Sequence, residues 1–305
     1  MTGKLEAGIK ELVEEFQASG KPCLSMKTVL ERRNSYAASA VLGGDSPKLA
    51  NEFLDILNKV QIKIYKPTSK EDLPITIYFH GGCFISGGFE THQAQLRQIA
   101  QQSNSIVICI KYRLAPEYTY PAAHDDVYQA VLGIKEHGSK YGGDTKKIVF
   151  MGDSAGGHLA LATALRLRNH SLWQPKKLIL IYPMLDPKGG SQSYKNFGSN
   201  YIITAKMLLS GFELYTNGDP KVIEEPELNL LRSDFSGLPS TTIVSAEFDP
   251  LRDEGEQLYK LMHSQGIDVH IDHYLGVIHG FFQLSSICDS ARKCINSMSK
   301  QIKSI

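Results

Sequence analysis

The sequence predicts an α/β fold in which helices flank a mostly parallel central sheet, with a helical cap added to it. Five short apolar runs are continuous rather than alternating, as expected of strands that are covered on both faces. These runs are Ile75–Phe79, Ile106–Ile110, Ile148–Met151, Leu178–Tyr182 and Thr241–Ala246. Helical stretches separate them, at Gln93–Gln102, Ala122–His137, Ala155–Arg168 and Leu251–His263. This alternation of strands and helices is typical of a doubly wound sheet.

The segments before the first apolar run predict helices that lie outside the sheet. Leu5–Phe16 carries its apolar residues on one helical face, and similar patterns follow at Thr28–Ala40 and Pro47–Lys59. Val60–Tyr65 then alternates strictly between apolar and polar residues, which predicts a half-exposed strand. We therefore expect residues 1–45 to form an N-terminal cap segment and residues 46–305 to form the main α/β domain.

One segment inside the main domain interrupts the alternation of strands and helices. Residues 186–200 are rich in Gly, Ser, Asn and Lys, and they lead into a helical pattern at Thr204–Thr216. Segments of this length between core strands are often lids or binding loops. We expect a cap insertion near residues 186–222.

Composition excludes several classes of function. The 305 residues are 42% hydrophobic and 21% charged, with 33 Lys+Arg against 32 Asp+Glu. Balanced charge argues against nucleic acid or an anionic membrane as a partner. The five cysteines form no CxxC pair, which argues against a zinc site or a disulfide framework. No apolar run approaches the ~20 residues of a membrane span, and no signal peptide is recognisable, so we expect a cytoplasmic protein without stable membrane association.

The strongest chemical signal is Gly152-Asp153-Ser154-Ala155-Gly156, which lies between a predicted strand and a predicted helix. A sharp turn between a strand and a helix is the context that a nucleophilic serine requires, and small residues must flank it for steric reasons. The alternative is a small-residue turn with an incidental serine. We interpret Ser154 as a nucleophile.

A second signal, His80-Gly81-Gly82-Cys83-Phe84, follows the predicted strand Ile75–Phe79. Acyl transfer places negative charge on a carbonyl oxygen, and backbone amides must stand where that charge develops. We expect the amides of Gly81, Gly82 and Ala155 to form the oxyanion hole. A plain glycine turn is the alternative.

A nucleophilic serine needs a base, and the base needs an acid to orient it. Asp249 follows the predicted strand Thr241–Ala246, and His279 follows the strand-like segment Val269–Tyr274. The chain order Ser, Asp, His is that of α/β-hydrolase triads. Asp249 alternatively caps the helix that begins near Pro250, and His279 is alternatively an ordinary loop histidine. We assign Asp253, four residues after Asp249, to helix stabilisation rather than to the triad.

Five ordered motifs together resemble the hormone-sensitive-lipase family of α/β-hydrolases, in its GDSAG-bearing branch. They are HGG-x-F, YRLAPE, GDSAGG, DPLRDEG and HGF, and they cover nearly the whole chain. The resemblance implies an α/β-hydrolase catalytic domain with Ser154 as nucleophile, His279 as base and Asp249 as acid. It also implies a cap made from N-terminal helices and an insertion, and structural hydrogen bonds in the YRLAPE segment. Cys83 departs from the family, which usually has a third glycine there.

These observations predict a cofactor-free, metal-free serine carboxylesterase that acts on short-chain, small-molecule esters, and a homodimer is compatible with the sequence. One alternative is an amidase or formamidase that uses the same triad. Another is a ligand-binding receptor on a hydrolase scaffold. The gibberellin receptor resembles this family but lacks the catalytic histidine, so the presence of His279 argues against that alternative.

Overall fold

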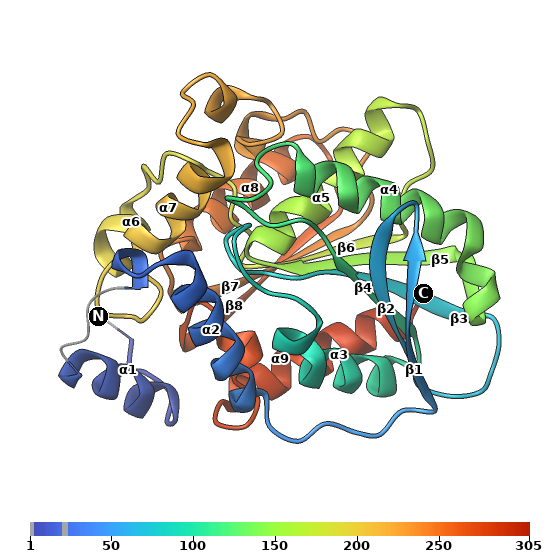
Figure 1. Ribbon diagram of the computed structural model, residues 1–305, viewed down its shortest axis with the longest axis horizontal. Coiled ribbons are helices and arrows are strands. Elements are labelled where there is room, and N and C mark those ends of the chain that lie inside the picture. Colours follow the sequence, from blue (N-terminus) through green and yellow to red (C-terminus); the bar gives the residue numbers. More distant parts are fainter. Residues whose placement is uncertain (1–2, 20–23) are drawn as a thin grey trace.

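The computed structural model describes residues 3–19 and 24–305, and a single eight-stranded sheet lies at its centre (Figure 1). The strands are β1 (Asn51–Leu57), β2 (Val60–Lys66), β3 (Leu73–Phe79), β4 (Ile106–Lys111), β5 (Gly143–Asp153), β6 (Lys177–Ile181), β7 (Thr241–Phe248) and β8 (Val269–Ile278). Their order in the sheet is β1-β2-β4-β3-β5-β6-β7-β8. β2 pairs antiparallel with β1 and β4, and every other pairing is parallel, as the sequence predicts.

Helices cover both faces of the sheet (Figure 1). One face carries α3 (Phe89–Ser103) and α9 (Asp289–Lys303), and the other carries α4 (Ala122–His137), α5 (Ala155–Asn169) and α8 (Arg252–Ser264). Alternate residues of a strand therefore enter two different cores. Ile77 and Phe79 belong to the core under α4 and α5, whereas Tyr78 belongs to the core under α3 and α9. Double coverage explains why the strand sequences are continuously apolar.

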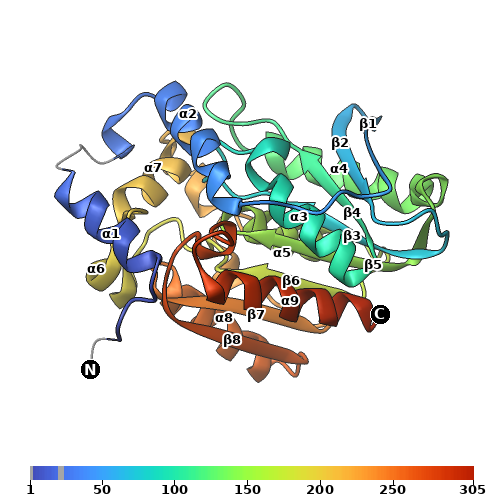
Figure 2. The ribbon, with the colours of Figure 1, turned by 90° about the horizontal axis from the view of Figure 1, so that it is seen from below.

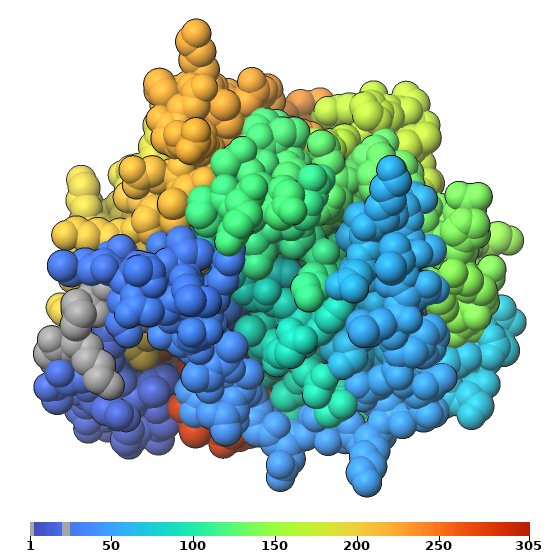
Figure 3. All heavy atoms as spheres, in the orientation of Figure 1, coloured from blue at the N-terminus to red at the C-terminus, as the bar shows by residue number. Residues whose placement is uncertain are grey.

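Four further helices gather at one end of the sheet and form what we call the cap. They are α1 (Ile9–Ala18), α2 (Val29–Ser39), α6 (Gln192–Phe197) and α7 (Ala205–Thr216). Figures 2 and 3 show the blue N-terminal segment lying against the yellow and orange insertion. Arg32 on α2 donates to Oγ of Ser210 at 3.1 Å and to the carbonyl of Met207 at 3.3 Å, and thereby joins the two parts.

The prediction of a helix over Pro47–Lys59 is wrong, because most of this segment is strand β1. Its apolar residues fit a helical period, but Leu54 and Ile56 lie on an edge strand and are 61% and 60% exposed. Asn58 and Lys59 have φ of 49° and 71°, the left-handed pair that a tight two-residue hairpin requires. Pairing of β1 with β2 across this turn overrides the local helical pattern.

Helices α6 and α9 were not expected from the sequence, although α9 carries a recognisable signal. Ala291, Cys294, Ile295, Met298 and Ile302 are buried at helical spacing along one face of α9. Within the part of the chain that the structure describes, no helix has the length and hydrophobicity required to cross a bilayer.

Candidate active site

Ser154 stands on a sharp turn between β5 and α5. Its backbone has φ 54° and ψ −119°, a strained conformation that lifts the side chain above the end of the sheet. A Cβ on Gly152 would collide with the carbonyl of Gly156, and a Cβ on Gly156 would collide with the carbonyl of Phe79. The flanking glycines are therefore required by the close approach of backbone to backbone.

Asp249 and His279 lie beside Ser154, although they are far apart in sequence. Nε2 of His279 is 3.0 Å from Oγ of Ser154, and Nδ1 is 2.8 Å from Oδ2 of Asp249. Asp249 follows β7 and is fully buried, and His279 follows β8 and is 6% exposed. Parallel neighbouring strands end at the same edge of the sheet, which is how the topology collects the three side chains.

The carboxylate of Asp249 has a second role at its other oxygen. Oδ1 accepts a hydrogen bond from the amide of Leu251 at 2.7 Å, in the turn that leads into α8. Helix α8 itself begins at Arg252. Asp249 therefore does not cap the helix, whose N-cap is Leu251, and its Oδ1 instead holds the turn that precedes the helix.

Asp253 contacts the cap instead of His279. Its Oδ2 accepts from the amide of Ser193 on α6 at 2.8 Å, and its Oδ1 accepts from the neighbouring Arg252 at 3.0 Å. The assignment of Asp253 to helix stabilisation is therefore incomplete, because this carboxylate also anchors α6 to α8.

Ser154 and His279 open into a cavity of about 290 Å³ between the sheet and the cap. Cap residues in its wall include Leu12, Arg32, Tyr36, Ile203 and Met207. Most of the lining is apolar, and its polar side chains come from α2, from the loop after β3 and from the strand ends that carry Ser154 and His279. The cavity can hold a small organic molecule with its reactive atom against Ser154.

The loop after β3 lies beside Ser154, but the first of its expected oxyanion amides already has a partner in the protein. The amide of Gly81 donates to Oδ1 of Asp153 at 2.8 Å, so it is engaged inside the protein. Gly82 and Cys83 line the cavity together with Ser154, whereas Gly81 does not. The geometry thus disagrees with the expectation for Gly81 and favours the amide of Cys83. The sequence leaves this amide open as a donor, because a backbone N–H does not depend on the side chain of its residue.

The thiol of Cys83 is not a second nucleophile. Burial raises the pKa of Cys83 to about 11, and the positive charge of Arg32 only partly opposes this rise. The thiol is therefore protonated at neutral pH, whereas thiolate is the reactive form. Cys83 has φ 53°, in the left-handed region that glycine adopts at lower cost.

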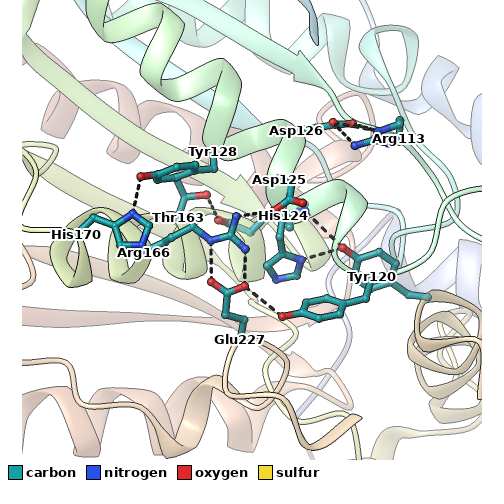
Figure 4. A network of polar contacts seen from close by, with 12 residues as sticks. Arg113, Tyr120, His124, Asp125, Asp126, Tyr128, Thr163, Arg166, His170 and Glu227 are labelled. Atoms are coloured by element: carbon teal, nitrogen blue, oxygen red, sulfur yellow. Dashed lines mark hydrogen bonds and ion pairs between the residues drawn. The ribbon is translucent and has the colours of Figure 1, made fainter. Parts of the chain in front are cut away.

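Polar residues outside the lining of this cavity hold loops in place (Figure 4). Arg113 forms a two-pronged pair with Asp126, which agrees with the structural role expected for the YRLAPE segment. Arg166 on α5 binds both carboxylate oxygens of Glu227, in the segment that follows α7. The second pair ties the chain after the cap insertion to a helix of the main domain, whereas the first holds the loop after β4 against α4.

Two histidines close to Ser154 in sequence or space make their bonds elsewhere. Nδ1 of His158 lies 2.8 Å from the carbonyl of Met184, and its Nε2 lies 2.8 Å from the carbonyl of Glu227. Burial lowers the pKa of His158 to about 4 and also lowers the pKa of His124. His158 therefore joins loops, and His279 is the histidine placed against Ser154.

Among the residues that the structure describes, no cluster of three or more His, Cys, Asp or Glu side chains is arranged to hold a metal ion.

The sequence of this chain matches known proteins over most of its length. A family model described as alpha/beta hydrolase fold matches residues 76–283. This range contains the loop after β3, the turn at Ser154, Asp249 and His279. The chain belongs to the hormone-sensitive-lipase-like family of α/β-hydrolases. An ethyl acetate hydrolase of Pseudomonas putida is 28% identical to this hydrolase over 297 residues, or 93% of each chain. An arylesterase of Saccharolobus solfataricus is 33% identical over 226 residues, or 73% of each chain.

The likeness extends to three-dimensional structure. A solved esterase from Pyrobaculum calidifontis superposes on this hydrolase with a TM-score of 0.93 and 30% identity. The superposition covers 99% of this chain and 98% of the esterase, so the cap helices are included along with the sheet.

Proposed function

We propose that this hydrolase is a serine carboxylesterase that cleaves small, short-chain esters through an acyl-enzyme. The observation that carries the proposal is the chain of contacts from Asp249 through His279 to Ser154, at 2.8 Å and 3.0 Å, at the floor of a cavity. The relatives named as esterases support the same chemistry.

In the proposed reaction, Oγ of Ser154 attacks the acyl carbon while Nε2 of His279 accepts its proton. Asp249 holds Nδ1–H and stabilises the imidazolium that forms. The carbonyl oxygen becomes an oxyanion, which accepts hydrogen bonds from the amides of Gly82, Cys83 and Ala155. The alcohol leaves with the proton from His279. Water then attacks the acyl-enzyme by the same route and releases the acid.

The sequence predictions of a cytoplasmic location, of no stable membrane association and of no nucleic-acid partner belong to this proposal, as does a compatible homodimer. So do the boundaries of the cap at residues 1–45 and near 186–222. The proposed reaction needs no cofactor, because its protons and its nucleophile come from side chains.

Ser154→Ala tests the proposal. We expect the variant to keep its fold, because Ala fits the tight turn, and to lose hydrolysis of p-nitrophenyl acetate. Matched ester and anilide substrates, measured on the wild-type protein, distinguish an esterase from an amidase. Retention of more than a few per cent of wild-type turnover by Ser154→Ala would contradict the proposed nucleophile.

A further inference from the structure

The second residue of the GDSAG motif, Asp153, is a buried carboxylate that the proposed reaction does not use. It is 2% exposed and stands immediately before Ser154, at the end of β5. Two donors bond to its Oδ1, the Tyr78 hydroxyl at 2.7 Å and the Gly81 amide at 2.8 Å, and Nε2 of His92 lies 3.1 Å from the same oxygen. Burying a charged carboxylate costs several kcal/mol in lost hydration, about as much as its partners return. A buried carboxylate that adds so little net stability points to a specific role.

The carboxylate is held in its ionised form. Burial alone would raise the pKa of Asp153, but His92 and the hydrogen bonds from Tyr78 and Gly81 lower it below its ordinary value. His92 contacts Oδ1 at ion-pair distance, and its Nδ1 lies 2.8 Å from the hydroxyl of Thr91. These contacts come from β3 and α3, so Asp153 is fixed from two sides.

The Gly81 amide is the point at which this carboxylate meets the oxyanion loop. A Cβ on Gly81 would collide with Oδ2 of Asp153, so the loop backbone lies directly on the carboxylate. The next two residues, Gly82 and Cys83, have φ of 129° and 53° and line the cavity beside Ser154. The Gly81 bond fixes the peptide at which the chain enters this turn. The carbonyl of Gly82, which shares a rigid peptide unit with the Cys83 amide, accepts from the amides of Ile85 and Ser86 at 3.1 and 3.0 Å and fixes the other end of the turn.

We propose that Asp153 is a positioning residue, which holds the Gly81 amide and thereby aims the amides of Gly82 and Cys83 at the developing oxyanion. Tyr78 and His92 fix the carboxylate that does this. The inference rests on the proposed esterase function. It adds that the residue before the nucleophile organises the loop that stabilises the transition state.

Asp153→Ala and Asp153→Asn separate this role from simple packing. Ala removes the acceptor for Gly81, whereas Asn keeps an oxygen in the same place. We expect Ala to lower kcat on p-nitrophenyl acetate by about 10²-fold, since one oxyanion donor is worth about 10²–10³ in kcat. KM should change by less than about threefold, because the oxyanion forms only after binding. Asn should retain at least about a tenth of wild-type kcat.

A trifluoromethyl ketone inhibitor reports on the oxyanion loop directly. Oγ of Ser154 bonds to its carbonyl carbon, the serine proton passes to Nε2 of His279, and the carbonyl oxygen becomes the oxyanion. The inhibition constant should rise in Asp153→Ala by the same factor by which kcat/KM falls. Thr76→Val is the matched control, because it removes a buried hydroxyl bonded to Ser105 on the same strand as Tyr78. It should lower Tm while kcat and the inhibition constant stay within about threefold.

If Asp153→Ala does not fold, the proposal is tested in Asp153→Asn through the amide proton resonance of Gly81 in ¹⁵N-glycine-labelled protein. Replacing the charged acceptor by a neutral one in Asp153→Asn should move that resonance upfield and speed its exchange with solvent. An unchanged resonance overturns the proposal. So does Asp153→Ala with wild-type kcat, a change in KM alone, or Asp153→Asn that loses as much kcat as Ala. Persistent turnover by Ser154→Ala would instead refute the esterase mechanism itself, so the two failures are distinguishable.

Discussion

Asp249→Asn is the substitution for which the structure gives the most detailed expectation. The two oxygens of Asp249 serve two donors, the Leu251 amide at 2.7 Å and His279 Nδ1 at 2.8 Å. Asparagine has one acceptor oxygen and so cannot serve both. If that oxygen stays on Leu251, the amide nitrogen faces Nδ1 and selects the tautomer with a proton on Nε2. That ring cannot accept the proton of Ser154.

The alternative rotamer also has a cost. Turning the oxygen toward His279 leaves the Leu251 amide facing another donor in a fully buried site. An unsatisfied buried donor costs about 1–3 kcal/mol, and 2.7 kcal/mol corresponds to about a hundredfold lower population. The neutral side chain also stabilises the imidazolium less. We therefore expect kcat to fall by about 10²–10⁴-fold, the upper value being that of the same change in chymotrypsin.

Asp253→Asn is the matched control, since it makes the same chemical change four residues away. It keeps one acceptor for Ser193 and weakens only a partly exposed pair with Arg252, so kcat should fall less than tenfold. Both variants are compared by kcat on one soluble acetyl ester, with Tm measured to confirm folding. A crippled Asp253→Asn enzyme beside a nearly normal Asp249→Asn enzyme would show that the triad is wrongly assigned.

Three further predictions concern stability and substrate size. Burial raises the pKa of Glu254 to about 8, so the unfolded state loses this proton at lower pH than the folded state. The wild-type free energy of unfolding should therefore fall between about pH 4.5 and 8, by at most about 1.4 kcal/mol per pH unit, and chemical denaturation should show that Glu254→Gln removes this slope. Glu227→Gln should destabilise the protein by about 1 kcal/mol in the same assay, because it removes one of the two carboxylates that pair with the partly buried Arg166 and leaves Asp125 as the other; an unchanged midpoint would argue against this. A cavity of about 290 Å³ should favour acetyl and butyryl esters over emulsified long-chain triglyceride, and faster triglyceride cleavage would contradict this expectation.

The parts of the fold that the sequence predicts well are those in which local pattern and tertiary burial agree. The doubly covered strands are continuously apolar, and Ala122–His137 is a helix with the expected bounds. β1 was missed because Leu54 and Ile56 are exposed, so its apolar residues do not mark a single buried face and its conformation depends on pairing with β2. That pairing depends on a turn at Asn58, which a helical period does not reveal.

The site shows the same division. Ser154, Asp249 and His279 were predicted because each follows a strand, and strand ends meet in a parallel sheet. Residue order cannot reveal which peptide N–H groups point into a cavity. Gly81 and Gly82 were expected as donors because glycine allows the backbone to turn its N–H groups inward. The direction of an amide depends on the dihedral angles of the loop and on its contact with the buried carboxylate of Asp153. Neither the angles nor this contact can be read from the sequence.

The cavity above Ser154 is roofed by segments that the main domain does not need for its own sheet. The strand ends carry the reacting groups, while α2 lines the opposite side of the cavity together with Met207 of α7, to which Arg32 is bonded. The residues that carry out the reaction and those that contact the rest of the substrate thus lie in different segments of the chain. Substitutions in the roof can change which esters fit while the bond-breaking apparatus stays intact. Exchanging cap segments between relatives should therefore change substrate selectivity while Ser154, His279 and Asp249 stay the same.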